Sequence, residues 1–188
     1  MIESKDRSGW FGASDVDKIV GNWKTKTWMD WWMIKLGIRQ CNFANEATLA
    51  GTHWEHKILD SLDIPDMQTD EQIIIPELLL RVNLDGSTKS KIYEVKSHKA
   101  EKAYKKPKNH RQQVQVQMFA KSVKEAEIVS YGLISEEYKN FFLPVDAERR
   151  KEHPVEYDLE FIEGLFLPRI TILADCLRRG EIPDEAIG

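Results

Sequence analysis

The stretch Arg81–Lys96 reads RVNLDGSTKSKIYEVK, and its Asp85, Glu94 and Lys96 could bring two carboxylates and one ammonium group to one place. Strand side chains alternate between faces, so Glu94 and Lys96 point the same way and Val95 the other. If the runs on either side of the glycine-containing segment pair as a hairpin, the Asp85 carboxylate reaches Glu94. Such a set is the minimum for Mg²⁺-assisted hydrolysis of phosphodiesters. The alternative is a turn aspartate followed by an exposed ion pair on a strand edge.

Size and composition indicate one globular domain with a sizeable core, since the chain has 188 residues and an ordinary composition. It contains no apolar run long enough to span a bilayer, and its first residues lack a signal peptide's apolar segment. We therefore expect a cytoplasmic protein with no membrane partner. Cys41 and Cys176 are far apart, which excludes an all-cysteine metal site and argues against a disulfide framework.

Charge is unevenly distributed along the chain. The net charge is −4, but residues 96–111 contain seven basic residues against the single acid Glu101. The seven are Lys96, Lys99, Lys102, Lys105, Lys106, Lys108 and Arg111. A basic stretch directly after the candidate carboxylates could hold a phosphate backbone. A solvated lysine-rich loop explains the same composition equally well.

Periodicity and capping residues give the expected elements. We predict helices over 14–20, 27–36, 46–62, 109–122 and 155–179, and strands over 72–75, 78–84, 92–97, 127–134 and 141–145. This order suits one mixed sheet covered by helices on both faces, in the α/β (α+β) class. All six tryptophans lie in the first 54 residues, where they either pack the core or stack on a base.

The helix over 46–62 brings a further carboxylate. Glu55 lies next to its apolar stripe, so it is either a surface residue or a shielded acid that needs a partner such as a metal. His53 and His56 flank it and are interpreted as structural or DNA-facing. The helix over 109–122 carries four glutamines, which either bind near a scissile phosphate or face solvent.

Five segments in order resemble the lambda-exonuclease/YqaJ family of phage recombination nucleases, within the PD-(D/E)xK superfamily. They are Gly12-Ala13-Ser14-Asp15-Val16, Leu49-Ala50-Gly51-Thr52-His53-Trp54-Glu55, Asn83-Leu84-Asp85-Gly86, Glu94-Val95-Lys96-Ser97 and Gln112-Gln113-Val114-Gln115-Val116-Gln117-Met118. The resemblance covers about residues 7 to 133. Leu84-Asp85 replaces the Pro-Asp of the superfamily's motif, and the chain is shorter than the family's larger members.

The resemblance implies a restriction-endonuclease-like sheet in a single domain, 1–188. Residues 1–45 would contact DNA ends, 46–135 would form the nuclease core, and 136–188 would add a strand and a long helix.

The resemblance also implies roles for individual residues. Asp85, Glu94 and the Val95 carbonyl would bind the metal, Glu55 would complete its site, and Lys96 would orient and help deprotonate the attacking water. Gln115, or in its place Gln112, would be the active-site glutamine. Ser14, at a helix N-terminus, would line a 5′-phosphate pocket with Arg7 as its basic partner. The residues expected to bind the DNA backbone are Lys99, Lys102, Lys105, Lys106, Arg111 and Gln112.

By this resemblance we expect a Mg²⁺-dependent 5′→3′ exonuclease that acts on double-stranded DNA ends, with Mn²⁺ able to substitute. It would leave 3′ single strands for a single-strand annealing recombination protein. The family also implies self-association as a trimer. One alternative is an endonuclease of the same fold, structure-specific or restriction-like. The other is a non-catalytic DNA-binding protein, against which the complete Asp85/Glu94/Lys96 set argues.

Overall fold

A five-stranded mixed sheet is the centre of the molecule. The computed structural model describes residues 8–39 and 46–187. In that part of the chain the strands follow each other in sequence order across the sheet, and all neighbours are antiparallel except β3 and β4. The strands are β1 (Gln68–Ile75), β2 (Leu80–Ser87), β3 (Lys91–Lys99), β4 (Glu125–Leu133) and β5 (Arg150–Glu156). The predicted mixed sheet is confirmed.

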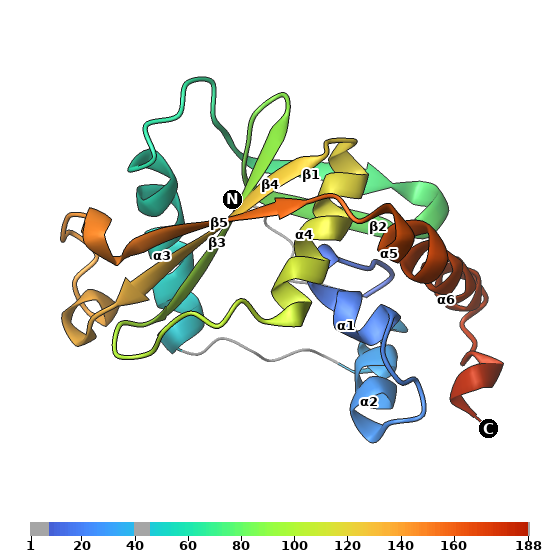
Figure 1. Cartoon of the computed structure of the whole chain (residues 1–188). Helices are drawn as coiled ribbons and strands as arrows, with labels where there is room; N and C mark the ends of the chain where they lie inside the picture. Colours follow the sequence, from blue (N-terminus) through green and yellow to red (C-terminus); the bar gives the residue numbers. More distant parts are fainter. Residues whose placement is uncertain (1–7, 40–45, 188) are drawn as a thin grey trace.

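Helices cover both faces of this sheet (Figure 1). The helices are α1 (Val16–Ile19), α2 (Lys26–Lys35), α3 (Glu46–Asp60), α4 (Lys108–Lys121), α5 (Leu159–Phe161) and α6 (Leu167–Arg179), with a π-helical turn, Ile162–Phe166, between the last two. Helix α4 lies in the crossover between the parallel strands β3 and β4, as a parallel connection requires. The helices over both faces are also as predicted.

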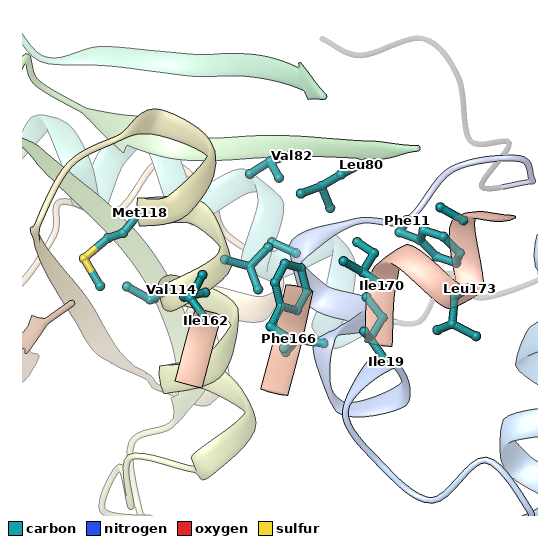
Figure 2. Packing of buried hydrophobic residues seen from close by; sticks show 14 of the residues in the cluster. Phe11, Ile19, Leu80, Val82, Val114, Met118, Ile162, Phe166, Ile170 and Leu173 are labelled. Atoms are coloured by element: carbon teal, nitrogen blue, oxygen red, sulfur yellow. The ribbon is translucent and has the colours of Figure 1, made fainter. Parts of the chain in front are cut away.

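Two hydrophobic cores follow from the alternation of side chains along the strands. Ile92 of β3 packs in one core with α4 and α6, and Figure 2 shows Met118 and Phe166 in it. Tyr93 and Val95 of the same strand pack in the other core, against α3. Each face of the sheet therefore positions a different helix over the Glu94 region, and these two helices contribute the remaining polar groups described below.

The N-terminal segment is attached directly to β2. The Phe11 N–H donates to the Leu79 carbonyl and the Arg81 N–H donates to the Phe11 carbonyl, each at 2.8 Å. Behind this bridge Trp28 and Trp32 are fully buried and stacked, with ring centroids 5.3 Å apart. Trp23 and Trp54 are buried as well, so the core-packing interpretation holds for these four tryptophans.

Two predictions about the last third of the chain are wrong. Residues 141–145 form turns rather than a strand, because Lys57 of α3 donates to the carbonyls of Phe141 and Leu143 and holds this segment against the helix. Residues 150–156 form β5 instead, an edge strand with charged residues and Pro154, whose pattern shows no clear apolar alternation. The closing helix accordingly starts at Leu159, capped by the Asp158 carboxylate, rather than at residue 155.

None of the helices in the described ranges is both long and apolar enough to cross a membrane.

Candidate active site

The strands β2 and β3 separate at the candidate carboxylates. Their described pairing covers Ser87 with Ile92 and Gly86 with Tyr93, so Asp85 and Glu94 are the next pair in register. Instead of a ladder bond, the N–H of Val95 donates to the Asp85 carboxylate at 2.8 Å. The separation leaves space between two strands that each carry an acid, and this region is called the fork below. The structure thus brings Asp85 and Glu94 together.

A third carboxylate reaches the fork from α3. Burial, and then the charge of Glu94, raise the pKa of Glu55 to about 7. Burial also raises the pKa of Asp85 well above its ordinary value, and the charges of Glu94 and Glu55 raise it further. Glu55 and Asp85, whose pKa values are raised by burial and by the charge of Glu94, fit a site for a divalent cation, whose charge would relieve the repulsion.

Lys96 lies on the same side of β3 as Glu94. Its ammonium donates to Glu94 Oε1 at 2.6 Å and to Gln113 Oε1 at 3.1 Å. Burial alone would lower the pKa of Lys96, but the attraction of Glu94, followed by Asp85 and Glu55, more than offsets it and raises the pKa. In this arrangement Lys96 is a protonated hydrogen-bond donor.

The predicted active-site glutamine requires a correction. Gln115 donates to the Glu156 carbonyl and accepts from the Asp158 N–H, both at 2.7 Å, so its amide faces β5. The amides that face the fork belong to Gln113 and Gln117, which each donate to the Glu94 carboxylate at 2.5 Å. Residues four apart share a helix face, whereas Gln115 lies roughly 200° around the helix from Gln113.

The alternative glutamine, Gln112, also lies away from the fork. It lines a different cavity, between α4 and the end of β5, together with Arg111 and Gln115. The structure therefore separates Gln112 and Arg111 from the three carboxylates. The spacing of four residues between Gln113 and Gln117 indicates that the two share a helix face. The sequence does not show which face of this helix turns toward the carboxylates.

A pocket of about 210 Å³ extends from the fork toward the N-terminal segment. Asp85 and Gln113 line it, and so do Ser14, Lys35 and Arg81. Ser14 is exposed within a 3₁₀ turn, Ala13–Asp15, so the helical segment predicted to begin at Ser14 begins one residue earlier, with Gly12 as its N-cap. Arg7, its predicted basic partner, lies outside the described residues.

Lys35 and Arg81 are cationic residues of this pocket that sequence reasoning missed. Lys35 is only 2% exposed and donates to Asp15 at 2.6 Å and to the Trp10 carbonyl at 2.9 Å. Arg81, Asn83 and Asp85 all line the pocket, as alternate residues on one side of β2 do. The alternation from Asp85 back to Arg81 along the strand could have predicted that Arg81 lies on the same side as Asp85. The sequence around Lys35 does not predict its place in the pocket, because its neighbours there come from a distant segment.

The basic loop connects β3 to α4. Lys99, Lys102, Lys105 and Lys106 are all exposed on it or at its start. Tyr104 anchors the loop: its ring stacks on His98 and His153, and its hydroxyl lies 2.9 Å from His110 Nδ1. Burial, and then the charge of Glu94, raise the pKa of Tyr104 to about 12. The exposed lysines are therefore attached to a loop that packs near the fork.

Glu55 also belongs to a cluster with His56 and Asp70. The ligand atoms of Glu55, His56 and Asp70 all fall within 4.8 Å of one another, and His56 Nε2 is 3.2 Å from the Asp70 carboxylate. Sequence reasoning interpreted His56 as structural or DNA-facing and did not single out Asp70. The structure pairs these two exposed side chains next to Glu55.

A model of the YqaJ-like viral recombinase domain matches residues 4–123, more than half of the chain. None of the curated proteins compared with the chain matches it. Solved structures do share the fold. LHK-Exo in complex with dAMP is 20% identical with a TM-score of 0.68, and the match covers 92% of this chain and 90% of that one.

Two further crystal structures have a similar fold. The alkaline exonuclease LHK-Exo from Laribacter hongkongensis is 20% identical with a TM-score of 0.66, over 92% of this chain and 93% of that one. A phage-related exonuclease from Haemophilus somnus 129PT is 15% identical with a TM-score of 0.59, over 91% and 92%. At these identities the likeness shows a common fold.

Proposed function

The chain belongs to the YqaJ-like viral recombinase family, and on this basis we propose that it is a metal-dependent nuclease that degrades double-stranded DNA ends 5′→3′. The 3′ single strand that remains would be used in phage-type recombination. The observation that supports this most is the single pocket that joins Asp85 and Gln113 to Ser14, Lys35 and Arg81. Only a DNA end offers a terminal phosphate that could occupy the far part of such a pocket while the next phosphate is hydrolysed.

Asp85, Glu94 and the Val95 carbonyl would hold Mg²⁺ or Mn²⁺, and Glu55 would complete the set. The donors fit this group because all are hard oxygen ligands and because three neighbouring carboxylates require a counter-charge. When bound, such an ion polarises the scissile phosphate and lowers the pKa of a bound water.

Lys96 would act as a cation rather than as the first acceptor of a proton. Its raised pKa keeps it protonated beside Glu94, so its ammonium can orient the attacking water and offset the charge that develops on the phosphate. Gln113, which bonds both Lys96 and Glu94, would keep this pair in place and can contact the phosphate from the pocket side.

The far part of the pocket would bind the terminal phosphate. Ser14 and the guanidinium of Arg81 are groups that hydrogen-bond phosphate oxygens well. Arg81 lies four residues from Asp85 along β2, about 13 Å at the usual rise of a strand. The long side chain of Arg81 can shorten that separation, which suits two phosphates of one strand. The solved relative LHK-Exo binds dAMP, a deoxynucleoside monophosphate like the product proposed here.

A direct test compares three substrates: linear duplex with 5′-phosphate ends, the same duplex with 5′-hydroxyl ends, and closed circular duplex. With Mg²⁺ we expect release of mononucleotides from the linear DNA, fastest from phosphorylated ends, and none with EDTA. The end that shortens first, read from strand-specific labels, gives the polarity. Efficient cutting of the circle would instead support an endonuclease of the same fold.

The matched control is Asp85→Asn, which keeps the size of the side chain and its capacity to accept from the Val95 N–H. We expect this variant to fold and to have lost DNA degradation. Undiminished degradation by Asp85→Asn would mean that the activity comes from a contaminant or from another site, and the assignment of Asp85 to the active site would be refuted.

Self-association and a partner are further proposals based on the family. A homotrimer would be recognised by its mass in light scattering. A single-strand annealing protein would be recognised by co-purification that survives nuclease treatment. The exposed lysines of the basic loop would contact the DNA backbone, so binding should weaken steeply with salt.

A further inference from the structure

Gln117 of α4 spans the fork. Its side-chain nitrogen donates to Glu94 Oε2 on β3 at 2.5 Å and, through a longer contact of 3.4 Å, to the Asn83 carbonyl on β2. The residue is fully buried. One amide therefore connects the two strands that carry the candidate metal ligands, at the point where their own hydrogen-bonded pairing has stopped.

The orientation of this amide follows from its neighbours. Both nearby groups, the Glu94 carboxylate and the Asn83 carbonyl, accept hydrogen bonds, so the NH₂ end must face them. Gln117 Oε1 then points elsewhere, and it has no hydrogen-bond partner among the residues that the structure describes. A buried carbonyl oxygen without a partner destabilises a fold. An apolar side chain of similar length would avoid that cost, but it would leave Glu94 Oε2 and the Asn83 carbonyl without this donor, so the glutamine serves to hold these two acceptors.

The two oxygens of Glu94 are used differently. Oε1 accepts from Lys96 and Gln113, and Gln113 lines the pocket, so this oxygen faces the side that substrate and ions can reach. Oε2 accepts from Gln117 on the buried side. Fixing Oε2 prevents the carboxylate from turning away from the fork.

We propose that Gln117 is a positioning residue that holds Glu94, and with it the width of the fork, in the geometry that binds a divalent cation. This inference rests on the proposed function, because it presumes that the fork is a metal site. Hydrogen-bonded partners of ligating carboxylates orient the ligand, and their loss commonly weakens metal binding by about 10- to 100-fold. Gln117 acts through Glu94 and does not line the pocket.

The experiment measures Mn²⁺ binding to the full chain without DNA, by electron paramagnetic resonance or calorimetry, for wild type and Gln117→Met. We expect the dissociation constant for Mn²⁺ to rise about 10- to 100-fold. The melting temperature in EDTA should fall, because the buried Glu94 carboxylate loses a donor, so Mn²⁺ affinities are compared at a temperature at which both proteins are folded. Gln117→Leu is the second variant, should Gln117→Met fold poorly.

Gln115→Met is the matched control, from the same helix and the same residue type. It loses the bonds to the Glu156 carbonyl and the Asp158 N–H, so we expect a lower melting temperature and unchanged Mn²⁺ affinity. If Gln117→Met, or the leucine variant in its place, binds Mn²⁺ as tightly as wild type, the positioning role is refuted. If wild type itself binds no Mn²⁺, the metal site of the proposed function fails instead.

Discussion

Replacing Glu55 by Gln should stabilise the metal-free protein at alkaline pH. The Glu55 carboxyl has a folded-state pKa of about 7, against an ordinary value of 4.5, because of burial and the charge of Glu94. Between these two values the folded state binds more protons than the unfolded state, so stability falls as pH rises through this window. Below it the folded protein has a neutral acid there, and above it the fork contains a destabilised carboxylate.

The size of the effect follows from the two pKa values. A difference from 4.5 to about 7 corresponds to about 3 kcal/mol, at about 1.4 kcal/mol per pKa unit. Glu55 is partly exposed, so solvent screening reduces this to about 2 kcal/mol. Glutamine has nearly the same shape and no charge to lose, so Glu55→Gln should recover this energy at pH 8 and little of it at pH 5.

The assay is urea unfolding in EDTA at pH 5 and pH 8, with the exposed Glu101→Gln as a control, which should change stability by less than about 0.5 kcal/mol. A gain for Glu55→Gln that is equal at both pH values, or absent at pH 8, would refute the reasoning. Saturating Mg²⁺ supplies a second reading. The cation should stabilise wild type more than Glu55→Gln, so the advantage of the variant should shrink, and the variant should lose nuclease activity.

Three further predictions concern the pocket and the fork. Arg81→Ala should reduce the preference for 5′-phosphate over 5′-hydroxyl ends toward one, measured as the ratio of initial rates; an unchanged ratio would place the terminal phosphate elsewhere. Lys96→Met should lower the maximal rate by about 10²- to 10³-fold while DNA binding changes little, measured by single-turnover digestion and by filter binding. Lys35→Met breaks a buried pair with Asp15 and should cost about 3–5 kcal/mol in urea unfolding; the matched Lys26→Met, whose pair is exposed, should cost less than about 1 kcal/mol.

Local rules were sufficient for much of the fold. Alternation along 92–97 places Glu94 and Lys96 on one side of β3 and Val95 on the other, and the structure has that arrangement. The helix predicted over 109–122 is present as Lys108–Lys121. The mixed sheet with helices on both faces also follows from the order of these elements. Such features depend on residues that are close in sequence, so they can be predicted from one amino-acid sequence.

The rotation of α4 about its axis was decided only by tertiary packing. Every glutamine in QQVQVQ has the same intrinsic chemistry, and the burial of Val114 and Met118 against the sheet turns Gln113 and Gln117 toward Glu94. Gln115 then faces β5. A one-residue error in that rotation moves a side chain by about 100°, and local periodicity does not specify the partner face.

The pocket beside the fork was also decided only by tertiary packing. Ser14, Lys35 and Arg81 come from three segments with no common motif, and the bridge between Phe11 and β2 brings them to the Asp85 side of the sheet. Sequence by itself determined the acids, the lysine and the strand faces that they occupy, because these depend on residue type and alternation. Tertiary structure decided which amides and cations meet those acids, because packing between distant segments sets every such contact.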